Sequence, residues 1–393
     1  MTETGTAKLA PLSRAATEIP PSGIRKFFDI AAQMKDIVSL GVGEPDFVTP
    51  WSIREYAIFS LEKGETNYTS NYGLPELRAA ISDHLEKLYS VSYQPENEIL
   101  VTVGVSEALD LAMRTILNPG DEVLVPEPSY VSYKPCVALA GGIAIGVETN
   151  AEDDFAVKVE ALEAGRTERT KAILLGFPSN PTGATMTASA MQAVVDFAVK
   201  HNLYLVSDEI YDRLTYDDTH VCVPALRQAR ERTILLNGFS KAYAMTGWRI
   251  GYACAPAPIL SVMMKIHSYT ALCAPITGQK AALDALRHGE QSVQEMRQEY
   301  NWRRRFLVEG LNRIGLTCHM PKGAFYAFPK ISATRLTSDQ FAERLLYDEH
   351  VAVVPGTAFG CGGEEHIRCS YATSREKLEI ALERMARLIK KLA

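Results

Sequence analysis

Polar and titratable side chains recur in this sequence directly after short apolar segments, where the strands of a sheet would end. The groups concerned are Gly104-Val105-Ser106, Glu127-Pro128-Ser129-Tyr130, Ser179-Asn180-Pro181-Thr182-Gly183, Asp208-Glu209-Ile210-Tyr211 and Gly238-Phe239-Ser240-Lys241, with Arg249 eight residues after Lys241. In an open α/β sheet, ligands bind outside the carboxyl ends of the strands. We therefore expect these groups to meet at one edge of a sheet and to form a binding site.

Each of these groups, taken alone, has an ordinary structural explanation. Ser179–Gly183 is foremost a turn sequence, and Asp208 is well placed to cap a following helix. A single lysine such as Lys241 is usually solvated, and Arg249 could form a surface ion pair. Only the combination of these groups predicts a binding site with a chemical function.

Part of the combination suits a phosphate group. Phosphates bind to backbone N–H groups at the start of a helix, to hydroxyl groups and to a bidentate cation. Gly104–Ser106, Ser240 and Arg249 can supply these three elements.

The remaining groups suit an aromatic aldehyde. Tyr130 could stack on an aromatic ring, the Asp208 carboxylate could keep a ring nitrogen protonated, and the Lys241 amine could form an imine with a carbonyl. Together with the phosphate groups, these are the requirements of pyridoxal phosphate, a cofactor whose ring withdraws electrons from its substrate.

The strands and helices that must position these residues are typical of an α/β core. Short apolar runs without polar alternation, separated by helical segments such as Ser106–Leu117, indicate a mostly parallel sheet that is covered on both faces. The expected strands are Ile99–Val103, Val123–Pro126, Ala172–Phe177, Leu203–Ser207, Ile234–Asn237 and Ile250–Ala253.

The last third of the chain reads as a smaller α+β domain. Gln291–Ile314 and Ser374–Leu392 have helical periodicity, with Ser374 as the expected N-cap of the second helix. Short strands are expected around 324–329, 351–354 and 366–370. We predict an N-terminal arm and part of the small domain in residues 1–45, a large domain in 46–290 and a small C-terminal domain in 291–393.

Composition sets the class of protein. The chain has 393 residues, of which 47% are hydrophobic and 22% charged, as expected for a globular protein of about two domains. The net charge is 41 − 47 = −6, which argues against a nucleic-acid-binding surface. The longest apolar run, Val137–Val147, is interrupted by Gly141 and Gly142 and is too short to span a membrane. The first twenty residues hold no apolar core, so we expect no signal peptide.

Cysteine usage points to a reducing compartment. The seven cysteines are scattered and form no CxxC pair, so we expect no zinc ribbon and no other metal site. Their odd number and wide spacing suit reduced thiols in a cytoplasmic protein.

Six motifs in order resemble one protein family over nearly the whole chain. The segment from Ser240-Lys241-Ala242 through Thr246-Gly247-Trp248-Arg249-Ile250-Gly251 is similar to the cofactor-lysine signature of class I/II aminotransferases, which are fold-type-I pyridoxal-phosphate enzymes of the aspartate aminotransferase superfamily. The other five motifs are Gly41-Val42-Gly43-Glu44-Pro45-Asp46-Phe47, Asn67-Tyr68-Thr69 before Gly73, Ser179–Gly183, Asp208–Tyr211 and Ile367-Arg368-Cys369-Ser370-Tyr371. The resemblance implies a mostly parallel seven-stranded sheet between helices, plus a smaller α+β domain.

The resemblance also implies roles for the residues around the cofactor. Lys241 would join the cofactor aldehyde as an imine and, once freed by a substrate, would move the proton at the substrate α-carbon. Asp208 would pair with the ring nitrogen, and Asn180 and Tyr211 would hydrogen-bond the ring hydroxyl. Tyr130 would stack on the ring and lie near the substrate.

The phosphate and the substrate would bind on either side of that ring. The backbone at Val105 and Ser106, together with Ser240 and Arg249, would hold the phosphate. Tyr68 would reach the phosphate of a neighbouring subunit, which implies a homodimer with shared active sites. On the substrate side, the planar guanidinium of Arg368 would bind the α-carboxylate of the substrate. The Gly43 backbone and Asn180 would assist Arg368.

The sequence departs from the family pattern at two positions. Gly238 stands where many relatives carry a second serine, and Val105 stands where a second glycine is common. Arg25 and Lys26 are candidates for reading a side-chain carboxylate of the substrate, and they could equally be surface charges.

These residues predict a transaminase with ping-pong kinetics that transfers the amino group of an L-amino acid to a 2-oxo acid, with 2-oxoglutarate as the expected acceptor. Aspartate, aromatic and diaminopimelate-type donors all stay open.

The alternative on the same fold is a pyridoxal-phosphate-dependent lyase or synthase, such as one that β-eliminates sulfur amino acids. A DNA-binding regulator is disfavoured because too few residues precede Gly41. A nicotinamide enzyme is disfavoured because no strand is followed by GxGxxG.

Overall fold

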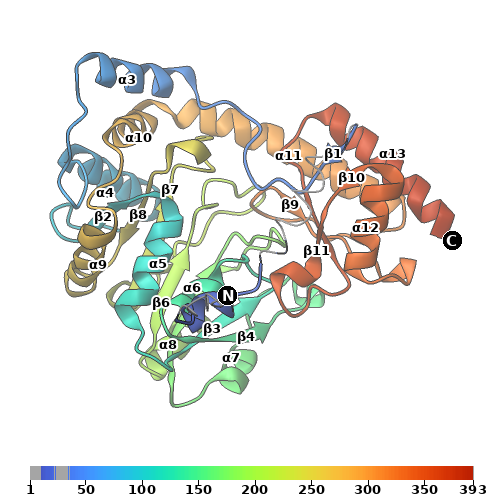
Figure 1. Cartoon of the computed structure of the whole chain (residues 1–393), viewed down its shortest axis with the longest axis horizontal. Helices are drawn as coiled ribbons and strands as arrows, with labels where there is room; N and C mark the ends of the chain where they lie inside the picture. The colour runs from blue at the N-terminus through green and yellow to red at the C-terminus, as the bar shows by residue number, and fades with distance from the viewer. Residues whose placement is uncertain (1–9, 22, 24–33, 35, 393) are drawn as a thin grey trace, which may run out of the picture.

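The centre of the molecule is a twisted sheet between two layers of helices (Figure 1). The computed structural model describes residues 10–21, 23, 34 and 36–392. Within these residues the large sheet has seven strands in the order β2-β8-β7-β6-β5-β3-β4. They are β2 Ile99–Thr102, β3 Glu122–Glu127, β4 Ile143–Glu148, β5 Thr170–Gly176, β6 Tyr204–Asp208, β7 Thr233–Gly238 and β8 Gly251–Cys254.

The predicted α/β fold with a mostly parallel sheet is confirmed. Strands β3 to β7 run parallel, whereas β8 lies antiparallel to both of its neighbours, β2 and β7. All six strands expected from apolar runs are present within two residues. The strand missed by that reading, β4, lies at the sheet edge with mostly exposed or half-buried residues, so it has no continuous apolar run.

Alternating side chains of the central strands enter two different cores. On β3, Val123 and Val125 pack with Met113 and other residues of one core, whereas Leu124 packs with Val194 in the other. Because successive strand residues point to opposite faces, a strand that is buried on both faces must be apolar throughout. The covering helices are α5 Gly104–Ile116, α6 Tyr133–Leu139, α7 Val159–Gly165, α8 Ala188–Lys200 and α9 Ala257–Thr270.

A third group of helices packs beside β2 and β8. These are α3 Trp51–Glu62, α4 Pro75–Tyr89 and α10 Ile276–His288, which share a core with the two strands. A short helix, α1 Arg14–Thr17, lies near the start of the chain. No helix in the described part of the chain is long and apolar enough to cross a membrane.

The C-terminal part folds around its own core of short strands and long helices (Figure 1). Strands β11 Val354–Pro355, β12 Ile367–Ser370 and β9 Tyr326–Ala327 form an antiparallel sheet, and β1 Val38–Ser39 pairs with β10 Val351–Ala352. The helices are α11 Glu290–Arg313, α12 Ser338–Glu349 and α13 Arg375–Leu392. Helix α11 places Val293 in the core beside β2 and β8 but Tyr300 and Leu307 in the C-terminal core. The domain division at residues 45 and 290 stays a proposal.

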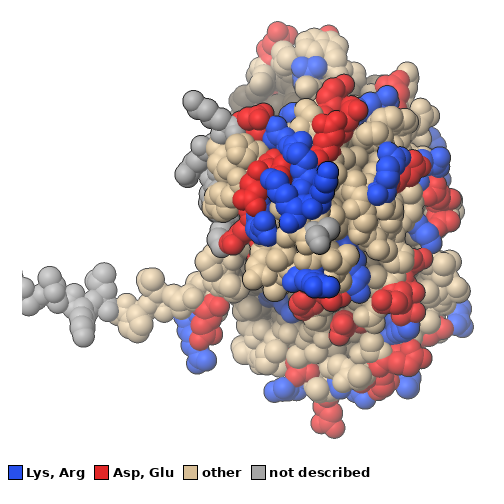
Figure 2. Space-filling model, turned by 90° about the vertical axis from the view of Figure 1, so that its right-hand side faces the viewer, with Lys and Arg blue, Asp and Glu red and all other residues tan. Residues whose placement is uncertain are grey.

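The face that carries α12 and α13 mixes charges of both signs (Figure 2). Glu349 at the end of α12 pairs with Arg387 and Lys391 of α13, and Arg384 pairs with Asp36. Basic residues on this face are therefore interleaved with acidic ones.

Candidate active site

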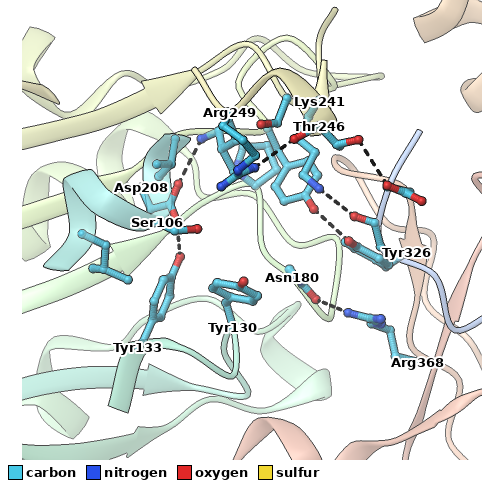
Figure 3. A pocket seen from close by; sticks show the side chains of 18 residues that line it. Ser106, Tyr130, Tyr133, Asn180, Asp208, Lys241, Thr246, Arg249, Tyr326 and Arg368 are labelled. Carbon is cyan, nitrogen blue, oxygen red and sulfur yellow. Dashed lines mark hydrogen bonds between the residues drawn. The ribbon is translucent and has the colours of Figure 1, made fainter. Parts of the chain in front are cut away.

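A cavity of 340 Å³ opens where the carboxyl ends of the central strands face the C-terminal part of the chain (Figure 3). It brings together nearly all of the residues singled out in the sequence. Those lining it are Gly43, Val105, Ser106, Tyr130, Asn180, Asp208, Tyr211, Ser240, Lys241, Arg249 and Arg368. Tyr68 does not line the cavity; it lies on the connection between α3 and α4 with 82% of its surface exposed. Arg25 and Lys26 lie outside the described residues.

Lys241 follows β7 and points into the cavity (Figure 3). Its Nζ donates to the backbone carbonyl of Gly43 at 2.6 Å. Burial lowers the pKa of this amine to about 8, and the nearby guanidinium groups of Arg368 and Arg249 act in the same direction. Lys241 therefore loses its proton far more readily than a solvated lysine does.

Asp208 is the last residue of β6 and is buried. Its Oδ2 accepts a hydrogen bond from the Tyr133 hydroxyl at 2.9 Å, and its Oδ1 accepts one from the Ile210 N–H at 3.2 Å. Burial raises the pKa of the Asp208 carboxyl to about 6, whereas the two hydrogen bonds lower it. A cationic partner in the cavity would favour the charged form further.

The start of α5 and Arg249 form one corner of the cavity. Arg249 has a φ of 57°, in the left-handed region, and its Nη1 donates to the Thr246 carbonyl at 2.9 Å. Gly104, at the first turn of α5, has a φ of 75°, and a Cβ there would lie 2.6 Å from Arg249 Nη2. Exposed N–H groups at a helix start beside a guanidinium suit an anion such as phosphate.

The two departures from the family pattern lie against each other in this corner. A Cβ at Gly238 would lie 2.8 Å from the Cα of Gly251 and 3.2 Å from Cγ2 of Val105. The Val105 side chain thus occupies space that a side chain at residue 238 would need. In the sequence, residues 105 and 238 are far apart and look independent. In the structure, the Val105 side chain lies next to Gly238.

Arg368, on β12, closes the opposite end of the cavity and is buried. Its Nη1 donates to Asn180 Oδ1 at 2.9 Å and its Nη2 donates to the Gly41 carbonyl at 2.6 Å. Its guanidinium carbon lies 4.5 Å from the Tyr326 ring centroid. Among the residues that the structure describes, its Nε has no hydrogen-bond partner although it is buried, and burial lowers the pKa of the group. A carboxylate ligand would relieve this unfavourable burial.

Gly43 lines the cavity and packs closely against its wall. A Cβ at this position would lie 2.8 Å from the Tyr326 hydroxyl. That hydroxyl shares a 2.8 Å hydrogen bond with the Tyr211 hydroxyl. The Gly43 backbone, Tyr211 and Tyr326 therefore form one packed wall.

Sequence reading missed several residues of this cavity. Tyr133 and Tyr326 hydrogen-bond to Asp208 and Tyr211, and Thr246 donates through its hydroxyl to Glu44 at 3.1 Å. Thr246 and Glu44 stand inside motifs that were recognised, so a signal for them existed. Tyr133 and Tyr326 stand in none of the recognised motifs.

Comparison with known proteins identifies the family. Residues 35–385 match the model of "Aminotransferase class I and II". The chain is 47% identical to the aspartate aminotransferase of Pyrococcus abyssi, over 95% of this chain and 96% of the relative. It is 44% identical to the aromatic-amino-acid aminotransferase 2 of Thermococcus litoralis, over 96% of this chain and 98% of the relative.

The chain belongs to the class I and II aminotransferases.

A solved structure agrees with this placement. Aspartate aminotransferase from Thermus thermophilus with maleate superimposes with a TM-score of 0.93 at 41% identity, covering 97% of this chain and all of that one. The predicted family, fold and transaminase activity are thereby confirmed. The named relatives are aminotransferases, so the lyase alternative is not favoured.

Proposed function

We propose that this aminotransferase uses pyridoxal phosphate to move the amino group of an L-amino acid to a 2-oxo acid, with 2-oxoglutarate as acceptor. The observation that carries the proposal is one cavity that holds the Lys241 amine, the Asp208 carboxylate and the Arg368 guanidinium. When bound, the cofactor supplies an aldehyde and an electron-withdrawing ring.

The residues present fit this cofactor. Arg249, Ser240 and the start of α5 suit its phosphate, and Tyr130 offers a ring face. The buried Asp208 carboxylate keeps lone pairs free to pair with a ring nitrogen. Asn180 and Tyr211 would hydrogen-bond the ring hydroxyl.

Lys241 would hold and move the proton at the substrate α-carbon. A general base works best when its pKa lies near the operating pH, and burial brings the pKa of this amine to about 8. Arg368 would bind the substrate α-carboxylate in bidentate fashion, with the Gly43 backbone and Asn180 beside it.

The named relatives include aspartate and aromatic-amino-acid aminotransferases, so both donor types belong to the proposal. A probable N-acetyl-LL-diaminopimelate aminotransferase of Bacillus subtilis is 40% identical, so a diaminopimelate-type donor also belongs to the proposal. Cytoplasmic location is supported by the seven cysteines, which are all free thiols.

We also propose a homodimer whose active sites are shared. Large apolar side chains are exposed on and near α3 and α9, among them Trp51 at 58%, Phe59 at 48% and Tyr269 at 88%. Exposed apolar surface of this kind is typical of a protein–protein contact. Tyr68, exposed on the connection that follows α3, would reach the partner's phosphate site.

The test is a panel of amino donors followed in single half-reactions through the absorbance of the bound cofactor. We expect the purified protein to be yellow and to need both a donor and 2-oxoglutarate for turnover. Lys241→Ala should lower activity by about 10²–10⁴-fold, the usual contribution of a positioned general base, whereas Lys377→Ala, at an exposed position of α13, should behave like the wild type. Release of ammonia and pyruvate without an acceptor would instead establish the lyase.

A further inference from the structure

Tyr133 lies beside the Asp208 carboxylate and also lines the cavity (Figure 3). It is the first residue of α6 and is buried. Its hydroxyl donates to Asp208 Oδ2 at 2.9 Å. None of the six recognised motifs contains it.

Packing holds this hydroxyl in one place. The Tyr133 ring meets the Tyr130 ring edge-on with centroids 5.6 Å apart, and the Tyr133 N–H donates to the Tyr130 carbonyl at 3.0 Å. The hydroxyl also passes over Gly176 at the end of β5, where any Cβ would overlap it. Its position is therefore set by β5, α6 and the ring-stacking residue Tyr130 together.

The charge on Asp208 depends on few neighbours. Burial and the adjacent Glu209 favour the protonated acid, whereas Tyr133, the Ile210 N–H and Lys241 favour the carboxylate. Burial and the neighbouring carboxylate also hold the pKa of Tyr133 well above its usual value. Tyr133 thus stays protonated and donates across the whole neutral range.

We propose that Tyr133 is a positioning residue that keeps the Asp208 carboxylate ionised and oriented toward the cofactor ring nitrogen. Oδ1 is taken up by Ile210 and Oδ2 by Tyr133, so the carboxylate cannot rotate freely and one lone pair on each oxygen stays available. This inference rests on the proposed use of pyridoxal phosphate.

The experiment measures the dissociation constant of pyridoxal phosphate by equilibrium dialysis between pH 5 and 9. In the wild type, affinity should fall on the acid side as Asp208 becomes protonated. Tyr133→Phe removes one hydroxyl, and we expect the midpoint of that fall to move up by about one to two pH units, as the loss of one hydrogen bond to a charged group predicts.

The matched control is Tyr89→Phe. Tyr89 also donates to a buried carboxylate, Asp212, at 2.8 Å, but it does not line the cavity. This variant should keep the wild-type midpoint. A midpoint in Tyr133→Phe that equals that of the wild type would overturn the inference.

A double-variant experiment distinguishes a role in positioning Asp208 from a general disturbance of the fold. If Tyr133 acts through Asp208, adding Tyr133→Phe to Asp208→Asn should weaken cofactor binding by less than about twofold. An equal loss in both backgrounds would show that the tyrosine acts only through the fold. A wild-type protein that binds no pyridoxal phosphate at any pH would refute the proposed function instead.

Discussion

Lys241, Asp208 and Arg368 are ionisable groups placed where water is largely excluded. Burial lowers the pKa of Lys241 to about 8 and raises that of Asp208 to about 6. Buried charges of this kind cost stability unless they are paired. In an active site the same arrangement brings the pKa values of Lys241 and Asp208 near neutrality, where acid–base chemistry needs them.

This cost predicts that a neutral residue at position 241 stabilises the cofactor-free protein. Because the pKa of Lys241 is lower in the folded than in the unfolded chain, its stability contribution is lost as pH falls from about 10.5 to about 8. Lys241→Met should therefore raise the free energy of unfolding by about 1–3 kcal/mol at pH 7. The gain should shrink toward pH 10. Urea unfolding at both pH values measures it, and a gain that does not change with pH would contradict the assignment.

The corner of the cavity that we propose for phosphate binding is formed by three elements that meet at glycines. The end of β7, the start of β8 and the start of α5 approach so closely that Gly238 and Gly251 leave no room for a Cβ, and a Cβ at Gly104 would meet the Arg249 guanidinium. Such contacts join a helix start to a strand end without a side chain between them.

Gly238→Ser tests this packing, because it adds a side chain where the structure leaves no room for one. The added atoms would meet the Gly251 backbone, so we expect a loss of about 1–3 kcal/mol in unfolding free energy and weaker cofactor binding. Adding Val105→Gly should restore part of the loss, because one of the crowding contacts comes from the Val105 side chain. Chemical denaturation of the single and double variants measures this coupling. Simple additivity would show that the two positions are independent.

At the scale of the whole molecule, Tyr68 has no partner in the cavity of its own chain. It lies 82% exposed near a surface that also exposes Trp51 and Phe59. A shared active site would explain why a residue of a recognised motif lies outside the cavity formed by the other five.

Hybrid dimers test the sharing directly. Tyr68→Phe should weaken cofactor binding about tenfold, as loss of one hydrogen bond to a charged group predicts, and Lys241→Ala should be inactive. When the two variants are mixed, unfolded and refolded together, one of the two sites in each hybrid combines an intact Lys241 with an intact Tyr68. That site should recover wild-type cofactor affinity. Tyr347→Phe, exposed on α12, is the control, and no recovery would mean that sites are not shared.

Much of the fold and of the site could be predicted from the sequence, because the signals were local. Apolar runs located six strands of the central sheet, and the segment from Ser240 to Gly251 carried its own recognisable pattern. A strand buried on both faces, or a residue type fixed by chemistry, leaves its mark within a few consecutive residues.

What the tertiary structure alone decided is which distant groups touch. Arg368 donates to Gly41, 327 positions away, Tyr133 donates to Asp208, 75 positions away, and Val105 lies beside Gly238. Tyrosine and valine are common in any core, so their types do not distinguish a packing role from a functional one. Hydrogen bonds and steric contacts depend on which residues are close in three dimensions. A short segment of sequence does not show which distant residues it will contact. The sequence itself therefore determined the chemistry and the order of the elements, and folding determined the partners that tune them.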